Sequence, residues 1–299
     1  MSGATATPLA APLAAPGRVL PRWVRLALLI GPGFFLIVLP FFGAMVMLGT
    51  YSLNLRDANG MGMGLSLWMD FASDGFNWSV LWNSVRIAGI STILSVALAY
   101  PVAAALLRVR SRAFLAFAYI ALFSPLLMSM VSRAYGWLLL LSDNGFVNQT
   151  LGLLFGIDPI RLVFNETGVI IAIVHVVLPY AVLPILNTMT QVPPVYREAA
   201  LDLGASGWTV FRRVTLPLTL PGVIVAAEII FALSASAFVT PSLLGGGRVL
   251  TLSQLVYENI GMIEWGMAAV QAIVLLVTAL AVLFVLERVN RATHAARES

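Results

Sequence analysis

The sequence contains no cysteine and no lysine, and only two histidines, His175 and His294. The lack of cysteine excludes disulfides, thiolate metal sites and cysteine nucleophiles. Two imidazoles are too few for a multi-histidine metal site within this chain, so we expect no metal ligands here. Without lysine the chain cannot carry the Gly-Lys-Ser/Thr loop that cradles nucleotide phosphates, so we expect no catalytic residues and no ATP hydrolysis by this chain alone.

Charge of either sign is also scarce. Only 10% of the 299 residues are charged and 60% are hydrophobic, which gives a mean hydropathy of +0.95. Ordinary soluble domains carry roughly 25% charged residues. A soluble core cannot bury so much apolar surface, whereas a lipid bilayer can. The composition therefore predicts a polytopic, all-α membrane protein, and the scattered arginines do not indicate a nucleic-acid-binding surface.

Six apolar segments have the length of about 20 residues that a helix needs to cross the hydrocarbon layer. They cover residues 26–48, 87–107, 113–131, 168–189, 219–240 and 268–286. The third is short, and the apolar piece at 135–142 behind it fits a half-helix or an interfacial turn. A seven-span interpretation is weaker because that piece is too short to cross.

The two ends of the chain are expected to be tails, at 1–22 and 291–299, around a transmembrane domain at 23–290. The first tail is rich in alanine and proline, which predicts disorder. A cleaved signal peptide is the alternative, but its apolar region would be about 7–15 residues long. The apolar run at 26–48 is longer, which favours an uncleaved first span.

Arginine is distributed unevenly between the connecting segments. With the N-terminus inside, 12 arginines fall on the cytoplasmic side and 5 on the other. Because short cytoplasmic loops are enriched in Arg and Lys, this asymmetry predicts that both termini are cytoplasmic. The same orientation makes 190–218 a cytoplasmic loop.

The loop at 190–218 contains an amphipathic stretch, "EAALDLGASGWTVFRRVTLP". Pro193 suits the first turn of a helix, and Gly204 is placed to end that helix in the left-handed conformation. Ser206 then caps a second short helix. Two charged helices with exposed apolar side chains such as Trp208 are predicted to bind in a groove of a partner protein. An interfacial helix resting on lipid headgroups fits the same pattern.

The spacing within this stretch resembles the EAA motif of permease subunits of bacterial ABC importers. That motif reads Glu-Ala-Ala, three residues, Gly, nine residues, an aliphatic residue, any residue, Leu and Pro. The matching residues are Glu198, Ala199, Ala200, Gly204, Val214, Leu216 and Pro217. Val214 stands where the family usually has Ile, which is a conservative departure. Shorter strings such as "LPYAVLPI" at 178–185 resemble the spermidine/putrescine-type branch.

This resemblance implies a six-helix permease fold whose EAA coupling helices dock on a dimer of cytoplasmic ATPase subunits. It also implies a second permease subunit, identical or a sister chain, and a periplasmic solute-binding protein. ATP and Mg would act on the partner ATPases, with no cofactor in this chain. The implied function is ATP-driven import of a small solute of the polyamine kind by alternating access in the bacterial inner membrane.

Two alternatives remain open at this point. An ABC permease for another small solute fits the same motif. A secondary transporter driven by an ion gradient would be expected to show inverted repeats and several membrane-buried ionisable groups. The sequence shows one clear buried acid, Glu228, and no convincing repeat. An intramembrane enzyme is less favoured still, because His175 and Glu228 do not make a catalytic constellation.

Glu228 lies in the middle of the fifth span, where a carboxylate is expensive. Insertion scales assign about 2.5–3.5 kcal/mol to an acid at that depth. Ser234, Ser236 and Thr240 follow toward the outer end of the same span. These four residues are the candidate solute path, in which Glu228 would attract a cation. Packing against a neighbouring helix or pairing with an arginine of the sister subunit is the alternative role.

Overall fold

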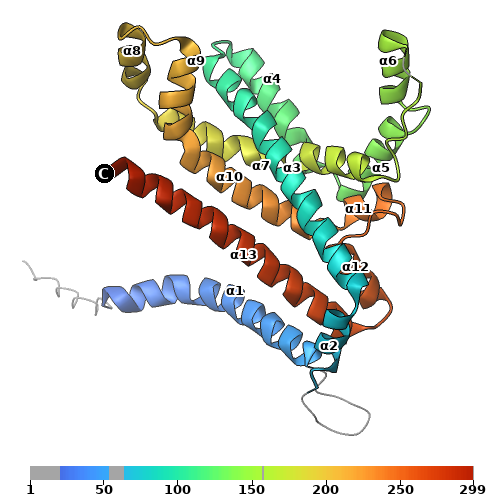
Figure 1. The fold of residues 1–299 in the computed structure, drawn as a ribbon. Helices are drawn as coiled ribbons and strands as arrows, with labels where there is room; N and C mark the ends of the chain where they lie inside the picture. Colours follow the sequence, from blue (N-terminus) through green and yellow to red (C-terminus); the bar gives the residue numbers. More distant parts are fainter. Residues whose placement is uncertain (1–20, 54–63, 157, 299) are drawn as a thin grey trace, which may run out of the picture. The chain divides into compact units, whose positions relative to one another are not determined.

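The computed structural model describes residues 21–53, 64–156 and 158–298, and these residues form helices with no β-strand among them (Figure 1). The chain divides into two units, Met1–Leu48 and Gly49–Ser299. The tail expected at 1–22 lies outside the described residues except for Pro21 and Arg22, and Arg22 is already helical.

The first unit contains one long helix, α1 (Arg22–Ser52), whose last four residues belong to the second unit. Pro32 and Pro40 lie inside it. Each proline removes one backbone donor, which membrane helices tolerate where other groups satisfy the freed carbonyl. The part of α1 from Leu29 onward is long and apolar enough to cross a membrane.

The second unit contains the helices that build the core and the loop. They are α2 (Ser66–Ser73), α3 (Gly75–Arg108), α4 (Arg112–Phe123), α5 (Met130–Leu141), α6 (Phe146–Phe155), α7 (Glu166–Gln191), α8 (Pro194–Asp202), α9 (Gly207–Val210), α10 (Leu216–Ser236), α11 (Val239–Leu244), α12 (Leu252–Gly261) and α13 (Trp265–Glu298). A 3-10 turn at Ser124–Leu127 follows α4, and a π-helical turn at Phe211–Thr215 joins α9 to α10. The residues expected as a C-terminal tail, 291–298, continue α13.

Helices α3, α7 and α10 pack against one another around the main core. Small residues recur every four positions along α3, and Ser91, Ser95, Ala99 and Ala103 are all fully buried. Small side chains let helix backbones approach closely, which stabilises helix pairs where lipid supplies little hydrophobic driving force. This stripe therefore faces neighbouring helices, as its spacing predicts.

The crossing of α7 and α10 depends on Gly222. A Cβ at this position would collide with the side chain of Thr188 and lie 2.8 Å from the carbonyl oxygen of Pro184. The glycine therefore permits a contact that any larger residue would push apart. This close approach fixes the start of α10, which continues directly from the amphipathic loop.

The chain breaks at two points on the side of the core where α5 and α11 lie (Figure 1): at Met128 before α5, and at Ala237, whose extended backbone separates α10 from α11. The segment expected as one span at 113–131 leaves helical geometry at Met128, whose backbone is extended, and α5 begins at Met130. The apolar piece at 135–142 is helical up to Leu141. Five described helices are long and apolar enough to cross a membrane, or six if the bent pair around Met128 is one span.

Polar contacts join α3, α12 and α13 at the end of the core farthest from the loop. The backbone N–H of Leu252 donates to Ser84 Oγ at 2.7 Å, and Asn259 Nδ2 donates to Gln271 Oε1 at 2.8 Å. An ion pair between Arg86 and Glu166 links α3 to the first turn of α7. The loop is positioned at the opposite end of the core, by α3, α7 and α10.

Candidate functional site

The amphipathic loop folds as two helices joined by a tight turn. Gly204 has φ +83°, its N–H donates to the carbonyl of Leu201 at 2.9 Å, and the N–H of Ala205 donates to the carbonyl of Ala200 at 3.1 Å. This pair of hydrogen bonds is a Schellman motif, which needs a left-handed residue at the position of Gly204. The expected helix end is therefore confirmed.

The second helix of the loop starts at Ser206. Its Oγ accepts from the backbone N–H of Thr209 at 3.2 Å, as expected for an N-cap. The chain then passes through the π-helical turn into α10 without an intervening coil. The loop is therefore joined to the core by a continuous helical backbone.

The loop exposes apolar side chains that the described part of the chain does not cover. Leu203 is 88% exposed and Trp208 is 69% exposed, and Val195, Tyr196 and Leu201 are exposed as well. Of the motif residues, Glu198, Ala199 and Gly204 are exposed, Ala200 is half-buried, and Val214, Leu216 and Pro217 are half-buried where the loop meets α10. The first part of the motif thus faces outward and the last part contacts the core.

Aromatic and hydroxyl contacts hold the loop to α3. Tyr100 hydrogen-bonds to Thr219 Oγ1 at 2.9 Å, and its ring meets that of Phe211 edge-on at 5.6 Å between centroids. Tyr100 comes from α3, Phe211 from the π-helical turn and Thr219 from α10. This contact is the point at which α3, the loop and α10 meet.

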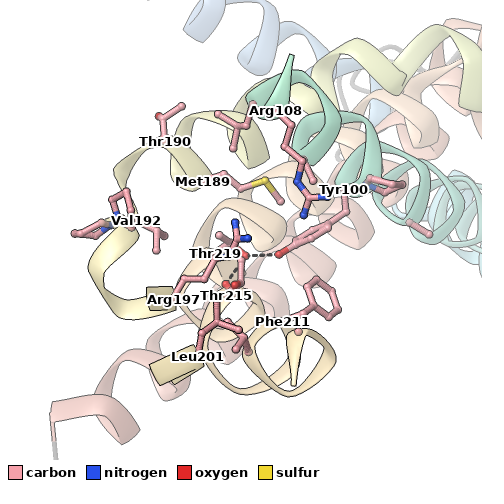
Figure 2. A pocket seen from close by; sticks show the side chains of 18 residues that line it. Tyr100, Arg108, Met189, Thr190, Val192, Arg197, Leu201, Phe211, Thr215 and Thr219 are labelled. Carbon is pink, nitrogen blue, oxygen red and sulfur yellow. Dashed lines mark hydrogen bonds between the residues drawn. The ribbon is translucent and has the colours of Figure 1, made fainter. Parts of the chain in front are cut away.

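A cavity of about 1040 Å³ lies beside this contact. Its walls come from α3, the end of α7, both loop helices and the start of α10. Figure 2 shows Arg108 and Arg197 reaching into it, with the Tyr100–Thr219 hydrogen bond between the walls. The cavity therefore has an apolar wall along α3 and two cationic groups.

A second cavity, of about 260 Å³, lies next to the two chain breaks. It is lined by Arg133 of α5, Tyr180 of α7, and Ser236 and Thr240 around the end of α10. Arg133 Nη1 donates a hydrogen bond to the carbonyl of Pro125 in the 3-10 turn. No acidic side chain lines this cavity, so its fixed charge is positive.

The structure separates the four candidate path residues. Ser236 and Thr240 line the Arg133 cavity, whereas Ser234 is 5% exposed and buried beside the core. Glu228 lines neither of these cavities and has Glu287 of α13 as an electrostatic neighbour. Its Oε1 atom is buried without a hydrogen-bond partner among the described residues.

His175 packs against a neighbouring helix. Trp137 Nε1 donates to His175 Nδ1 at 3.3 Å, and the two rings meet edge-on. Within the part of the chain that the structure describes, no three His, Cys, Asp or Glu residues cluster as a metal site would require. The histidine thus joins α5 to α7.

Sequence reasoning missed Arg133 and Tyr180 as cavity residues. In the predicted orientation Arg133 is one of the five arginines on the outer side. The available signal was its position between two apolar pieces, 113–131 and 135–142, because an ionisable residue flanked by apolar segments is a site candidate by default. For Tyr180 the sequence offers no comparable signal, since its position depends on how α7 meets α5.

Comparisons with known proteins agree on one family. The family model described as "Binding-protein-dependent transport system inner membrane component" matches residues 89–293. The chain is 30% identical over 262 residues to the spermidine/putrescine transport system permease protein PotB of Escherichia coli (strain K12), covering 86% of this chain and 94% of that protein. It is 32% identical over 218 residues to the PotB protein of Haemophilus influenzae, covering 71% of this chain and 74% of the relative.

A solved structure has the same fold. It is the crystal structure of a bacterial ABC transporter involved in the import of the acidic polysaccharide alginate, with a TM-score of 0.73 and 19% sequence identity. The match covers 90% of this chain and 96% of the other. Both the amphipathic loop and the two cavities lie inside the region that the family model matches.

Proposed function

Because the chain belongs to the family of inner-membrane components of binding-protein-dependent transport systems, it is a transmembrane permease subunit of an ABC importer, and we propose that its solute is a polyamine. It is a multi-pass protein of the inner membrane, and the expected all-α permease fold is confirmed. As expected, the chain is a transport subunit, and ATP hydrolysis belongs to a separate subunit of such importers.

The amphipathic loop supports a docking role on ATPase subunits. Its exposed Leu203 follows α8 directly and its exposed Trp208 lies in α9, at the end of the core where α7 ends and α10 begins. Amphipathic helices of this kind bind in hydrophobic grooves of partner proteins. We propose that Glu198, Ala199, Ala200 and Gly204 contact the ATPase, and that Val214, Leu216 and Pro217 transmit its movement to α10.

The orientation proposed for the chain puts the loop and both termini in the cytoplasm. The arginine asymmetry supports it, since 12 of the 17 basic residues then lie inside. A dimer of ATPases would contact the loop from this side, bind ATP and Mg, and close around them. A periplasmic binding protein would deliver the solute to the opposite side, and a second permease subunit would complete the pore.

Reporter fusions test this orientation. We expect fusions at residues 60 and 250 to report the periplasm and a fusion at residue 205 to report the cytoplasm. An alkaline phosphatase reporter, active only outside, and a fluorescent reporter, active only inside, give opposite readings at each position. A cytoplasmic reading at 250 contradicts the orientation and with it the docking side of the loop.

The names of the similar permeases support a polyamine as the solute, and Glu228 supplies a carboxylate that fits a cation. The Arg133 cavity does not fit a polycation, because its guanidinium group repels positive charge and none of the lining residues is acidic. We therefore propose that Glu228 is the residue of this chain that contacts the solute. Of the other candidate path residues, Ser236 and Thr240 line the Arg133 cavity and Ser234 is buried, so none of the three is proposed to bind the cation.

A second candidate solute follows from the Arg133 cavity. A cavity with one arginine, several hydroxyls and no acid suits a carboxylate, because guanidinium and carboxylate groups pair by two parallel hydrogen bonds. A small solute that carries a carboxyl group is therefore the alternative. The solved structure with the same fold serves an acidic polysaccharide, so the fold itself does not fix the charge of the solute.

Uptake by a reconstituted importer tests the proposal. The chain would be co-expressed with its neighbouring ATPase and permease genes, purified, and placed in liposomes with ATP and the binding protein. We expect ATP-dependent accumulation of radiolabelled spermidine or putrescine. Accumulation of a carboxylate-bearing amino acid instead would support the second candidate, and transport that persists without the ATPase would contradict the ABC importer assignment.

A further inference from the structure

The cavity of about 1040 Å³ carries positive charge that no acidic residue in its lining neutralises. Arg108 and Arg197 line it, and none of its lining residues is acidic. Neither arginine forms an ion pair among the residues that the structure describes. Because a guanidinium group left without a counter-charge attracts anions, the pattern points to an anionic ligand.

The two guanidinium groups line the same cavity, so a single anion is a candidate ligand for both. Arg108 ends the long helix α3, and Arg197 lies in the loop helix α8. Figure 2 shows the two side chains reaching into the cavity from different walls, with Tyr100 and Thr219 nearby. A phosphate group has enough acceptor oxygens to take hydrogen bonds from both arginines at once.

Apart from the two arginines and the hydroxyl residues Tyr100, Thr190, Thr215 and Thr219, the cavity lining is apolar, and it extends along α3. The α3 residues that line it are Ala97, Tyr100, Pro101, Ala104, Leu107 and Arg108, which form one face of the helix. At about 1.5 Å per residue, this face is about 16 Å long. That length matches one leaflet of a bilayer whose hydrocarbon core is about 30 Å thick. Leu107 is 45% exposed, so an acyl chain can reach this wall from the surface.

We propose that this cavity binds an anionic phospholipid of the cytoplasmic leaflet. Its phosphate lies between Arg108 and Arg197, and an acyl chain lies along the α3 face down to Ala97. Basic pockets between transmembrane helices on the cytoplasmic side bind such headgroups in general. The inference rests on the cytoplasmic orientation in the proposed function, and it goes beyond that function by assigning a lipid site.

The site would give the lipid a role in positioning the loop. One ligand would contact both α3, a rigid core helix, and α8, which carries Glu198 and the other outward-facing motif residues. A soluble anion would reach the arginines but leave the apolar face along α3 uncovered. The length and apolar character of that face therefore favour a lipid over free phosphate.

Lipid retention by the assembled importer tests the site. The importer would be placed in nanodiscs of phosphatidylcholine with increasing phosphatidylglycerol, and retained phosphatidylglycerol would be counted by native mass spectrometry. We expect the R108Q/R197Q variant to bind about 30-fold more weakly, or roughly fivefold for each arginine. The R108K/R197K variant keeps both charges and should retain most of the binding.

The matched control is R110Q/R112Q, which removes two exposed arginines of the same connecting segment that do not line the cavity. We expect it to bind phosphatidylglycerol like the wild type. Equal losses in both double variants would overturn the proposal, because they indicate attraction to surface charge in general. Displacement of the lipid by inorganic phosphate or glycerophosphoglycerol would overturn it too, since the site would then bind soluble anions.

Lipid retention is measured without solute, so the result does not depend on whether the solute is a polyamine. Failure of the chain to co-purify with ATPase subunits would instead contradict the proposed function before any lipid is added. A wild-type importer that retains no phosphatidylglycerol above phosphatidylcholine would contradict the lipid site alone.

Discussion

Substitution of Gly204 by valine is expected to leave the permease inserted in the membrane and to uncouple ATP hydrolysis from transport. Gly204 has φ +83° at the end of α8. A β-branched residue resists this left-handed conformation by roughly 1–2 kcal/mol. No atom would clash with the added Cβ itself, so the change acts on the backbone of the turn and redirects α8.

Glu198→Lys is expected to act on the same interface through charge. Glu198 is exposed in α8, where the proposed docking would give it a charge-assisted hydrogen bond. A bond of this kind contributes about 1.5–3 kcal/mol, so its loss weakens ATPase association roughly 10- to 100-fold. Glu198→Gln, which keeps the shape and removes the charge, should fall between the wild type and Glu198→Lys.

Co-purification of the ATPase and solute-stimulated ATP hydrolysis measure both effects. Gly207→Ala is the matched control for Gly204→Val, because Gly207 lies in the same loop without a positive φ and without atoms near an added Cβ. We expect this control to couple normally. Normal solute-stimulated hydrolysis in both Gly204→Val and Glu198→Lys would show that the loop does not dock as proposed.

Glu228→Gln is expected to reduce polyamine uptake roughly 10- to 100-fold with the importer still assembled. The range corresponds to the loss of a hydrogen bond between a carboxylate and a cation, which contributes about 1.5–3 kcal/mol. Glu228 Oε1 is buried without a partner among the described residues. Its electrostatic neighbour Glu287 is also an acid, so this neighbour does not neutralise it. A cationic solute would supply the missing partner.

Initial rates of uptake into liposomes measure the effect, and recovery of the ATPase on purification reports assembly. Glu264→Gln makes the same chemical change at an exposed carboxylate and should transport like the wild type. Glu228→Asp keeps the charge and should retain part of the activity. Unchanged uptake in Glu228→Gln would remove the solute role, and failed assembly would support packing or pairing with the sister subunit.

The amphipathic loop could be predicted closely from the sequence because its structure is determined by local geometry. Gly204 ends α8 because only glycine adopts a left-handed backbone easily. Ser206 caps the next helix through a hydroxyl three residues from its partner, Thr209. Both signals act within one helical turn, so the order of residues is sufficient to specify them. The apolar lengths of the long helices are local in the same sense.

The bend at Met128 could not be predicted from the sequence as readily. The segment 113–131 is apolar throughout, and apolar length by itself does not distinguish a straight span from a bent one. In the structure Pro125 lies in the 3-10 turn, and Arg133 donates to its carbonyl from the following helix. That carbonyl also accepts from the backbone N–H of Met128 at 3.4 Å, so the arginine adds a second hydrogen bond at the break, and this contact depends on the bend itself.

The sequence by itself determined the class of protein, the apolar helices and the EAA loop, because composition and short-range spacing carry that information. Only the tertiary structure decided which side chains share a cavity. It separated Glu228 from Ser236 and Thr240, placed Arg133 beside those two hydroxyl residues, and brought Arg197 into one cavity with Arg108. These groupings join helices that are distant in the sequence. They depend on how α3, α7 and α10 pack, which close contacts such as that at Gly222 fix and helical periodicity does not encode.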